Sequence, residues 1–178
     1  MSYWIGVGPA VLLAVMIAQR LGELYLTAKH LPYIRAHGGV EYGRGHFPLI
    51  VAVHVLFPIL FVIELTHHHT QRGALWPLWL ILFAAAQVLR YSAIVALGER
   101  WTTRIFVLPG APLVRTGPYR RLRHPNYVAV VVEFIAAPML FGAWRTAIVI
   151  GVLNAAVLRL RIRCENDALQ RAAVDSSR

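Results

Sequence analysis

Five long apolar stretches constrain this chain more than any other feature. They cover roughly residues 4–27, 47–66, 74–97, 126–141 and 144–160, and a helix of about 20 apolar residues spans the hydrocarbon core of a bilayer. Of the 178 residues, 58% are hydrophobic, which is more apolar surface than a soluble domain of this size buries. Only Gly142 and Ala143 separate the last two stretches. The sequence therefore predicts an all-α, polytopic membrane protein with five transmembrane helices, the last two forming a helical hairpin.

Basic residues are unevenly distributed among the segments that connect these stretches. If the amino terminus lies outside, the cytoplasmic segments hold fourteen Lys and Arg, and the opposite segments hold only Arg72 and Arg145. Positive charge favours the cytoplasmic side of a membrane protein. We therefore expect an integral membrane protein with its amino terminus outside and its carboxyl terminus in the cytoplasm. The net charge of +10 fits this topology better than a nucleic-acid-binding stripe, so we expect no nucleic-acid partner.

Several classes of chemistry find no support in the sequence. The single cysteine, Cys164, excludes an internal disulfide, and no Cys/His cluster has the spacing of a zinc site, so we expect no metal. The G-x-G at Gly6 and Gly8 lies inside an apolar stretch, and no dinucleotide-binding fingerprint follows a predicted strand. The chain shows no internal repeat and is predicted to be one domain over residues 1–178.

Charged residues inside the apolar stretches are candidates for function, because a charge in the bilayer needs a partner, a cavity or a route to the interface. Arg20 and Glu23 lie three apart on one helical face, so they either neutralise each other or line a substrate cavity. Glu133 lies about two turns into the fourth stretch. It either serves as a base or cofactor anchor, or forms a buried structural pair with Arg90. His54 is interpreted as a buried, hydrogen-bonded histidine.

The segment from Leu113 to Asn126 has the composition of an ordered loop at the membrane surface. Gly117-Pro118 indicates a turn, and Pro125 is well placed for the start of a helix. The mixture of Tyr119, His124 and Tyr127 suits a pocket for a polar, partly aromatic small molecule.

A second polar pattern lies near the end of the chain. Asn154, Arg161 and Glu165 are spaced at i, i+7 and i+11, which places them on one side of a continuous helix. This side either faces a ligand or belongs to an amphipathic helix whose arginines contact lipid headgroups.

The run "RTGPYRRLRHPNYVAVVVE", followed by "RIRCENDAL", resembles the isoprenylcysteine carboxyl methyltransferase family of integral membrane, S-adenosylmethionine-dependent enzymes. The stretch "ELYLTAKHLPYIRAHGGVEYGRGHFPLIVAVH" is similar to the branch found beside bacterial type III polyketide synthases. The resemblance implies three amino-terminal membrane helices in residues 1–97, and a cofactor-binding loop, helical hairpin and carboxyl-terminal helix in residues 98–178. Asn166 replaces the second acid of the family's usual Glu-Glu pair, and Ala129 stands where glycine is common.

The resemblance also implies site residues. We expect a cytoplasmic pocket for S-adenosylmethionine, whose product is S-adenosylhomocysteine, formed by Val114, Gly117, Tyr119, Arg123, His124, Pro125, Tyr127, Asn154, Arg161 and Glu165. Catalytic roles are expected for Glu133, Arg104 and Arg90, because a phenolic acceptor needs a modest base or a cation that stabilises phenolate.

The implied function is methyl transfer to an oxygen of a lipophilic acceptor that enters from the bilayer. The polyketide branch favours a phenolic or pyrone lipid, such as an alkylresorcinol or alkylpyrone. The alternatives are methylation of isoprenylcysteine carboxyl groups or of phospholipids, a membrane reductase, and a non-enzymatic transport or assembly subunit. The sequence carries no signal for an oligomeric state.

Overall fold

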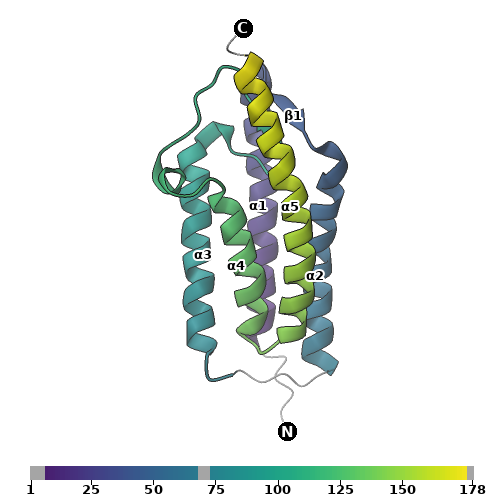
Figure 1. Cartoon of the computed structure of the whole chain (residues 1–178). Helices are drawn as coiled ribbons and strands as arrows, with labels where there is room; N and C mark the ends of the chain where they lie inside the picture. The colour runs from purple at the N-terminus through teal and green to yellow at the C-terminus, as the bar shows by residue number, and fades with distance from the viewer. Residues whose placement is uncertain (1–6, 68–72, 176–178) are drawn as a thin grey trace.

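In the described part of the chain, five α-helices run side by side along one axis (Figure 1). The structure is a computed structural model that describes the backbone of residues 7–67 and 73–175 and the side chains up to Ala172. The helices are α1 (Val7–Ala36), α2 (Phe47–His67), α3 (Trp76–Leu97), α4 (Pro125–Met139) and α5 (Trp144–Asp175). Three short 3-10 helices occur in the connections: η1 (Arg44–His46), η2 (Gly98–Arg100) and η3 (Gly117–Arg120).

Three of the five predicted spans are confirmed as helices long and apolar enough to cross a membrane. They comprise α1, the stretch from η1 through α2, and the stretch from α3 through η2. α4 is apolar but has only 15 residues, and a helix of that length reaches about 22 Å, less than the roughly 30 Å of a hydrocarbon core. The count of five complete spans therefore stays a prediction, whereas an integral membrane protein is supported.

The structure is mostly helical, as the all-α prediction expected, and adds one short sheet that the sequence did not predict. β1 (Val40–Tyr42) and β2 (Ile105–Val107) form a two-stranded antiparallel sheet in which Glu41 is opposite Phe106. These segments are rich in β-branched and aromatic residues, which favour strands. Their pairing joins the connection between α1 and α2 to the connection between α3 and α4. These connections are far apart in the sequence, so no local pattern predicted the pairing. The helix boundaries also differ: α1 continues to Ala36 and α5 to Asp175, because no helix-breaking sequence stops either helix where its apolar stretch ends.

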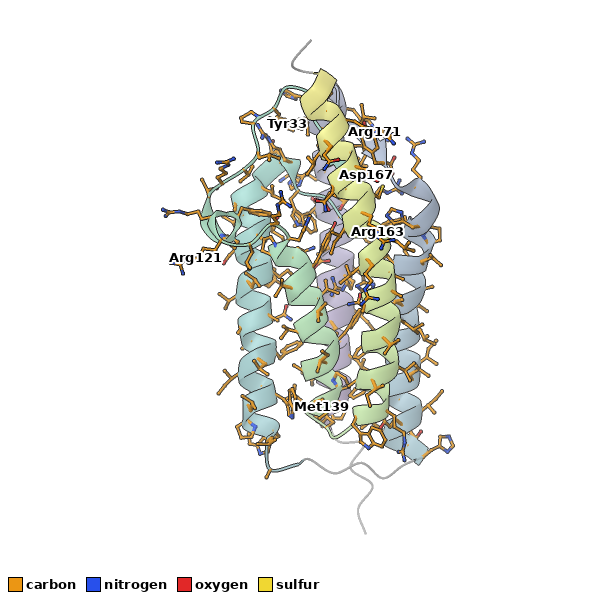
Figure 2. All side chains as sticks on the ribbon, in the orientation of Figure 1. Tyr33, Arg121, Met139, Arg163, Asp167 and Arg171 are labelled. Atoms are coloured by element: carbon orange, nitrogen blue, oxygen red, sulfur yellow. The ribbon has the colours of Figure 1, made fainter. Side chains whose placement is uncertain are left out.

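The predicted helical hairpin is present. α4 and α5 pack against each other and are joined by residues 140–143 (Figure 1). Met139 marks the hairpin end of the bundle, and Arg121, Arg163, Asp167 and Arg171 all lie in the other half (Figure 2). We refer to the end that carries Arg121, Arg163 and Arg171 as the basic end.

Aromatic side chains form the centre of the core between α2 and α4. The ring of Phe57 lies 5.4 Å from that of Phe134 and 5.7 Å from that of Phe61, and Phe61 contacts Phe141 at 5.9 Å. Such contacts add to the stabilisation that comes from burial. The core therefore holds α2 against the hairpin, whereas outward-facing apolar side chains remain for lipid contact.

Glu64 joins the last turns of α2 to the beginning of α5. Its carboxylate accepts hydrogen bonds from the backbone N–H of Arg145 at 3.1 Å and of Thr146 at 2.7 Å, and from the Thr146 hydroxyl at 2.6 Å. The first N–H groups of a helix have no partner within the helix, and its dipole favours a negative charge there. A buried carboxylate from another helix thus caps α5.

Glu64→Ala is expected to lower the free energy of unfolding by about 1–3 kcal/mol, because it leaves buried N–H groups of α5 unpaired. Thermal unfolding in detergent micelles measures this loss. Glu99→Gln, which removes an exposed acid from η2, is the matched control. Equal stabilities of the two variants would contradict the capping role.

Candidate functional site

Four charged side chains from α1, α3 and α4 form one buried network. Glu23 accepts hydrogen bonds from Arg20 at 2.7 Å and from Arg90 at 3.0 Å. Glu133 accepts hydrogen bonds from Arg20 at 2.5 Å and from the second terminal nitrogen of Arg90. Arg90 and Glu133 are fully buried. Two cations and two anions balance, as charges removed from water require.

This network decides between the alternatives left open by the sequence. Arg20 and Glu23 do both things at once, since they pair with each other and also line a cavity. Glu133 and Arg90 form the expected buried pair and do not line that cavity. One oxygen of Glu133 accepts from both guanidinium groups and the other accepts from the Gln87 amide at 3.4 Å, so the geometry suits a positioning role better than that of a base facing substrate.

The cavity has a volume of about 420 Å³ and lies between α1, α2, α4 and α5. Most of its lining is apolar. Leu21 of α1 and Val55 of α2 line it and are also 61% and 55% exposed on the outside of the bundle. α1 and α2 come close at few points along their length. The cavity therefore opens sideways between α1 and α2, onto a surface that lipid would cover.

The predicted loop motif and the carboxyl-terminal acid meet at the basic end of the cavity. Tyr127 donates a hydrogen bond from its hydroxyl to Glu165, and Arg161 Nε donates to the Tyr127 oxygen at 2.8 Å. The His124 ring stacks on that of Tyr127 at 5.1 Å, with its Nδ1 3.7 Å from a Glu165 oxygen. Arg161 also donates to the Thr103 carbonyl at 2.6 Å. Folding thus joins the start of α4, the middle of α5 and the segment after η2.

The environment of Tyr119 keeps its phenol neutral. Burial raises the pKa of the Tyr119 hydroxyl above its usual value, and the negative charge of Glu165 raises that pKa further. A neutral phenol can donate a hydrogen bond. Tyr119, on η3, therefore adds a donor beside the Glu165 carboxylate.

Two buried polar atoms of this region have no hydrogen-bond partner in the described part of the chain. They are Nε2 of His124 and Oδ1 of Asn126. An unpaired buried polar atom costs about 1–3 kcal/mol, so such atoms mark places where a polar ligand would restore the missing bonds. This donor and acceptor pair, beside the aromatic rings and the Glu165 carboxylate, fits a ligand that is polar, partly aromatic and positively charged.

Two other predicted site residues make contacts outside these hydrogen bonds. Arg104 shares a small pocket with Arg161, and its guanidinium pairs with Glu41 at 2.9 Å and lies 4.9 Å from the centre of the Phe47 ring. Gly117 has a φ of 53°, and a β-carbon there would lie 3.2 Å from that of Ala96, so this glycine packs η3 closely onto α3.

The remaining predicted residues differ mainly in their burial. Arg123 is exposed and Val114 is half-buried in the loop, whereas Pro125 is buried at the start of α4. Asn154 is buried and lines the cavity on α5. Ala129 is also fully buried, and Asn166 is half-buried. Over residues 7–67 and 73–175 there is no cluster of three or more metal-binding side chains.

Sequence reasoning missed Thr103 and Asn126, which both line the cavity. Asn126 had a detectable signal, since it lies between Pro125 and Tyr127 in the loop motif. Thr103 had none, because its link to α5 is a backbone carbonyl contact between residues 58 positions apart.

Comparison with known proteins adds an independent observation. Residues 79–171, about half of the chain, match the model of the isoprenylcysteine carboxyl methyltransferase (ICMT) family. The chain belongs to this family. The matched segment includes α4, most of α5 and the cluster around Tyr127 and Glu165. The ICMT match, together with the apolar helices, makes the protein a membrane methyltransferase.

Two bacterial relatives are similar over most of their length. "Uncharacterized protein YpbQ" of Bacillus subtilis (strain 168) is 34% identical over 164 residues, which are 92% of this chain and 98% of the relative. "Uncharacterized protein" of Haemophilus influenzae (strain ATCC 51907 / DSM 11121 / KW20 / Rd) is 27% identical over 157 residues, which are 88% of this chain and 91% of the relative. No solved structure shows a significant match. The similarity to these relatives therefore extends over most of this chain, beyond the residues of the family match.

Removing one partner of the buried network should be costly. Glu133→Ala is expected to lower the free energy of unfolding by about 3–5 kcal/mol, because Arg20 and the buried Arg90 are left with one carboxylate, that of Glu23, between them. The double variant Arg90→Met/Glu133→Leu should lose less, since the remaining pair of Arg20 and Glu23 is balanced. Unfolding in detergent micelles, followed by circular dichroism, compares the two.

Arg44→Ala is the control for this experiment, since the Arg44 side chain is 77% exposed and its partner Glu41 keeps a second ion pair with Arg104, so the loss should be small. A double variant that is less stable than Glu133→Ala would contradict the account of the network as a set of mutually neutralising charges.

Proposed function

We propose that this protein is an S-adenosylmethionine-dependent O-methyltransferase of a bacterial inner membrane, and that its acceptor is an amphiphilic lipid with a phenolic or pyrone head. One observation carries the proposal. A single cavity begins between α1 and α2, where lipid would contact the bundle, and ends at the polar cluster formed by Tyr127, Arg161 and Asn126. A water-soluble donor and a lipid acceptor can meet only in a site that has both an apolar and a polar end.

The donor site is assigned to the basic end, where the family match and the unpaired buried atoms coincide. His124 Nε2 and Asn126 Oδ1 would provide hydrogen bonds to the donor, and Glu165 would attract a positively charged group. The donor supplies an electrophilic methyl carbon. Substitution at that carbon is in line, so the main contribution of the protein is to hold the two reactants close and collinear, which can supply roughly 7–11 kcal/mol.

The charge balance of the cavity favours a neutral acceptor head. Arg20 faces the cavity, but its guanidinium already binds the carboxylates of Glu23 and Glu133. Arg161 is likewise held, by Tyr127 and the Thr103 carbonyl. An anionic acceptor, such as prenylcysteine or a phospholipid, would be expected to need an unpaired cation. A phenol or pyrone needs none, and the resemblance to the polyketide branch points in the same direction.

The proposed orientation places the basic end in the cytoplasm, where the soluble donor is available. The excess of Lys and Arg on that side supports it. A transport or assembly subunit would account for the helices and the charge distribution, but not for a cavity that ends at the unpaired Oδ1 of Asn126, beside the stacked rings of His124 and Tyr127.

Binding of S-adenosylhomocysteine tests the donor site. The purified protein is expected to bind this product saturably in calorimetry, and Glu165→Ala should weaken binding about 10-fold or more, because a charge-assisted contact contributes about 1.5–3 kcal/mol. Asp167→Ala removes an exposed acid two residues further along α5 and is the control. Unchanged affinity in Glu165→Ala would remove that residue from the site, and absence of saturable binding by the unaltered protein would favour the non-enzymatic alternative.

Transfer of a labelled methyl group tests the acceptor and the orientation together. Sealed inside-out membrane vesicles are expected to label alkylresorcinols or alkylpyrones, whereas right-side-out vesicles should not, because the charged donor does not cross the bilayer. Label found on prenylcysteine analogues or phospholipids but never on phenolic lipids would overturn the acceptor assignment. If right-side-out vesicles label these lipids as well as inside-out vesicles do, with the donor added outside in both cases, the proposed orientation is wrong.

A further inference from the structure

His54 of α2 lies on the cavity wall in a defined hydrogen-bonding state. Its Nδ1 is 2.7 Å from the carbonyl oxygen of Ile50. A carbonyl oxygen only accepts hydrogen bonds, so Nδ1 carries the hydrogen. In the neutral ring the other nitrogen, Nε2, then has a free lone pair. No residue of the described chain donates a hydrogen bond to this Nε2, and the ring is held from one side by Phe134, 4.9 Å away.

The charged groups around His54 suit a base that is neutral at rest and cationic for a short time. From α1, Arg20 and Glu23 line the same cavity; behind them, Arg90 of α3 and Glu133 of α4 complete the network. The sum of these four charges is zero: the cation of Arg20 favours the neutral ring at rest, and the anion of Glu23 favours the imidazolium. α5 adds the uncharged Asn154 to the lining.

We infer that His54 is the general base of the reaction, an inference that rests on the proposed methylation of a phenolic lipid. The acceptor hydroxyl donates its hydrogen bond to Nε2. As the phenol oxygen forms its bond to the methyl carbon, its proton moves to Nε2 and the carbon–sulfur bond breaks, with its electron pair remaining on sulfur. The sulfonium charge is lost and an imidazolium charge appears, so charge is conserved. The imidazolium then releases its proton to water, which restores the neutral ring.

The inference assigns the base to a residue other than Glu133. Glu133 binds two guanidinium groups and does not line the cavity, whereas His54 lines it and its Nε2 accepts no hydrogen bond from the described chain. Glu133 and Arg90 then act through Arg20 and Glu23, which they hold in place on the opposite wall.

Acceptors of different acidity separate a base from a structural histidine. In His54→Ala, methylation of an ordinary alkylphenol is expected to fall about 10²–10⁴-fold, the usual contribution of a general base. A nitro-substituted alkylphenol that is ionised at the assay pH has no proton to remove, so its rate should change far less. His37→Ala is the matched control, since His37 Nδ1 makes the same bond to the carbonyl four residues earlier, at 2.8 Å, but lies outside the cavity.

A binding measurement provides a readout besides turnover. His54→Ala should bind the alkylphenol about 3- to 10-fold more weakly, the effect of one neutral hydrogen bond, and should bind the corresponding methyl ether, which has no hydrogen to donate, with unchanged affinity. His54→Gln, which keeps a polar side chain but no basic nitrogen, should recover phenol binding without recovering turnover.

The outcomes are distinct. Loss of turnover with the ordinary phenol only, with S-adenosylhomocysteine binding intact, supports the inference. Equal losses with both phenols, or no loss with either, overturn it while the methyltransferase assignment stands. Failure of the unaltered protein to bind S-adenosylhomocysteine overturns the proposed function and this inference with it.

Discussion

The ion network of Arg20, Glu23, Arg90 and Glu133 is the interaction on which the rest of the structure depends. Hydrophobic association does not hold apolar helices together inside a bilayer, because lipid tails are as apolar as their side chains. Charges buried there are strongly disfavoured unless each finds its partner. The network therefore fixes α1 to α3 and α4 at one depth and in one orientation. α1 remains separated from α2 along much of its length, and that separation is the cavity.

α5 is the second helix that positions the site, because contacts with other elements fix it both at its first turn and near Arg161. Glu64 of α2 caps its first turn, and Arg161 anchors it further along to Tyr127 and to the Thr103 carbonyl. Between these points Asn154 and Leu158 form part of the cavity wall. The position of Glu165 beside His124 and Tyr127 thus follows from contacts made elsewhere along the helix, which is how a residue near the end of the chain becomes part of a site that begins at α4.

The cavity changes from apolar to polar along its length, and this gradient is what the proposed reaction requires. Leu21 and Val55 lie at the side opening, His54 and Arg20 line the wall, and Asn126 and Tyr127 lie at the polar end. In the proposed reaction these three parts would contact the acceptor tail, the acceptor head and the donor, so that each reactant would reach the site from the phase in which it dissolves. The enzyme then needs to supply orientation and one proton acceptor, and no charge has to enter the apolar part of the cavity before the reaction.

Local sequence determined the membrane class, the helical hairpin and the loop motif, because hydrophobic length and turn residues act over short distances. The resemblance of residues 115–133 and 161–169 also predicted the methyltransferase family. Only the tertiary structure decided which partner each charge has. Glu133 and Arg104 were equal candidates in the sequence, yet one is buried between two guanidinium groups and the other pairs with Glu41 beside a sheet that spacing did not reveal. Long-range contacts fix these outcomes, and no local pattern encodes them.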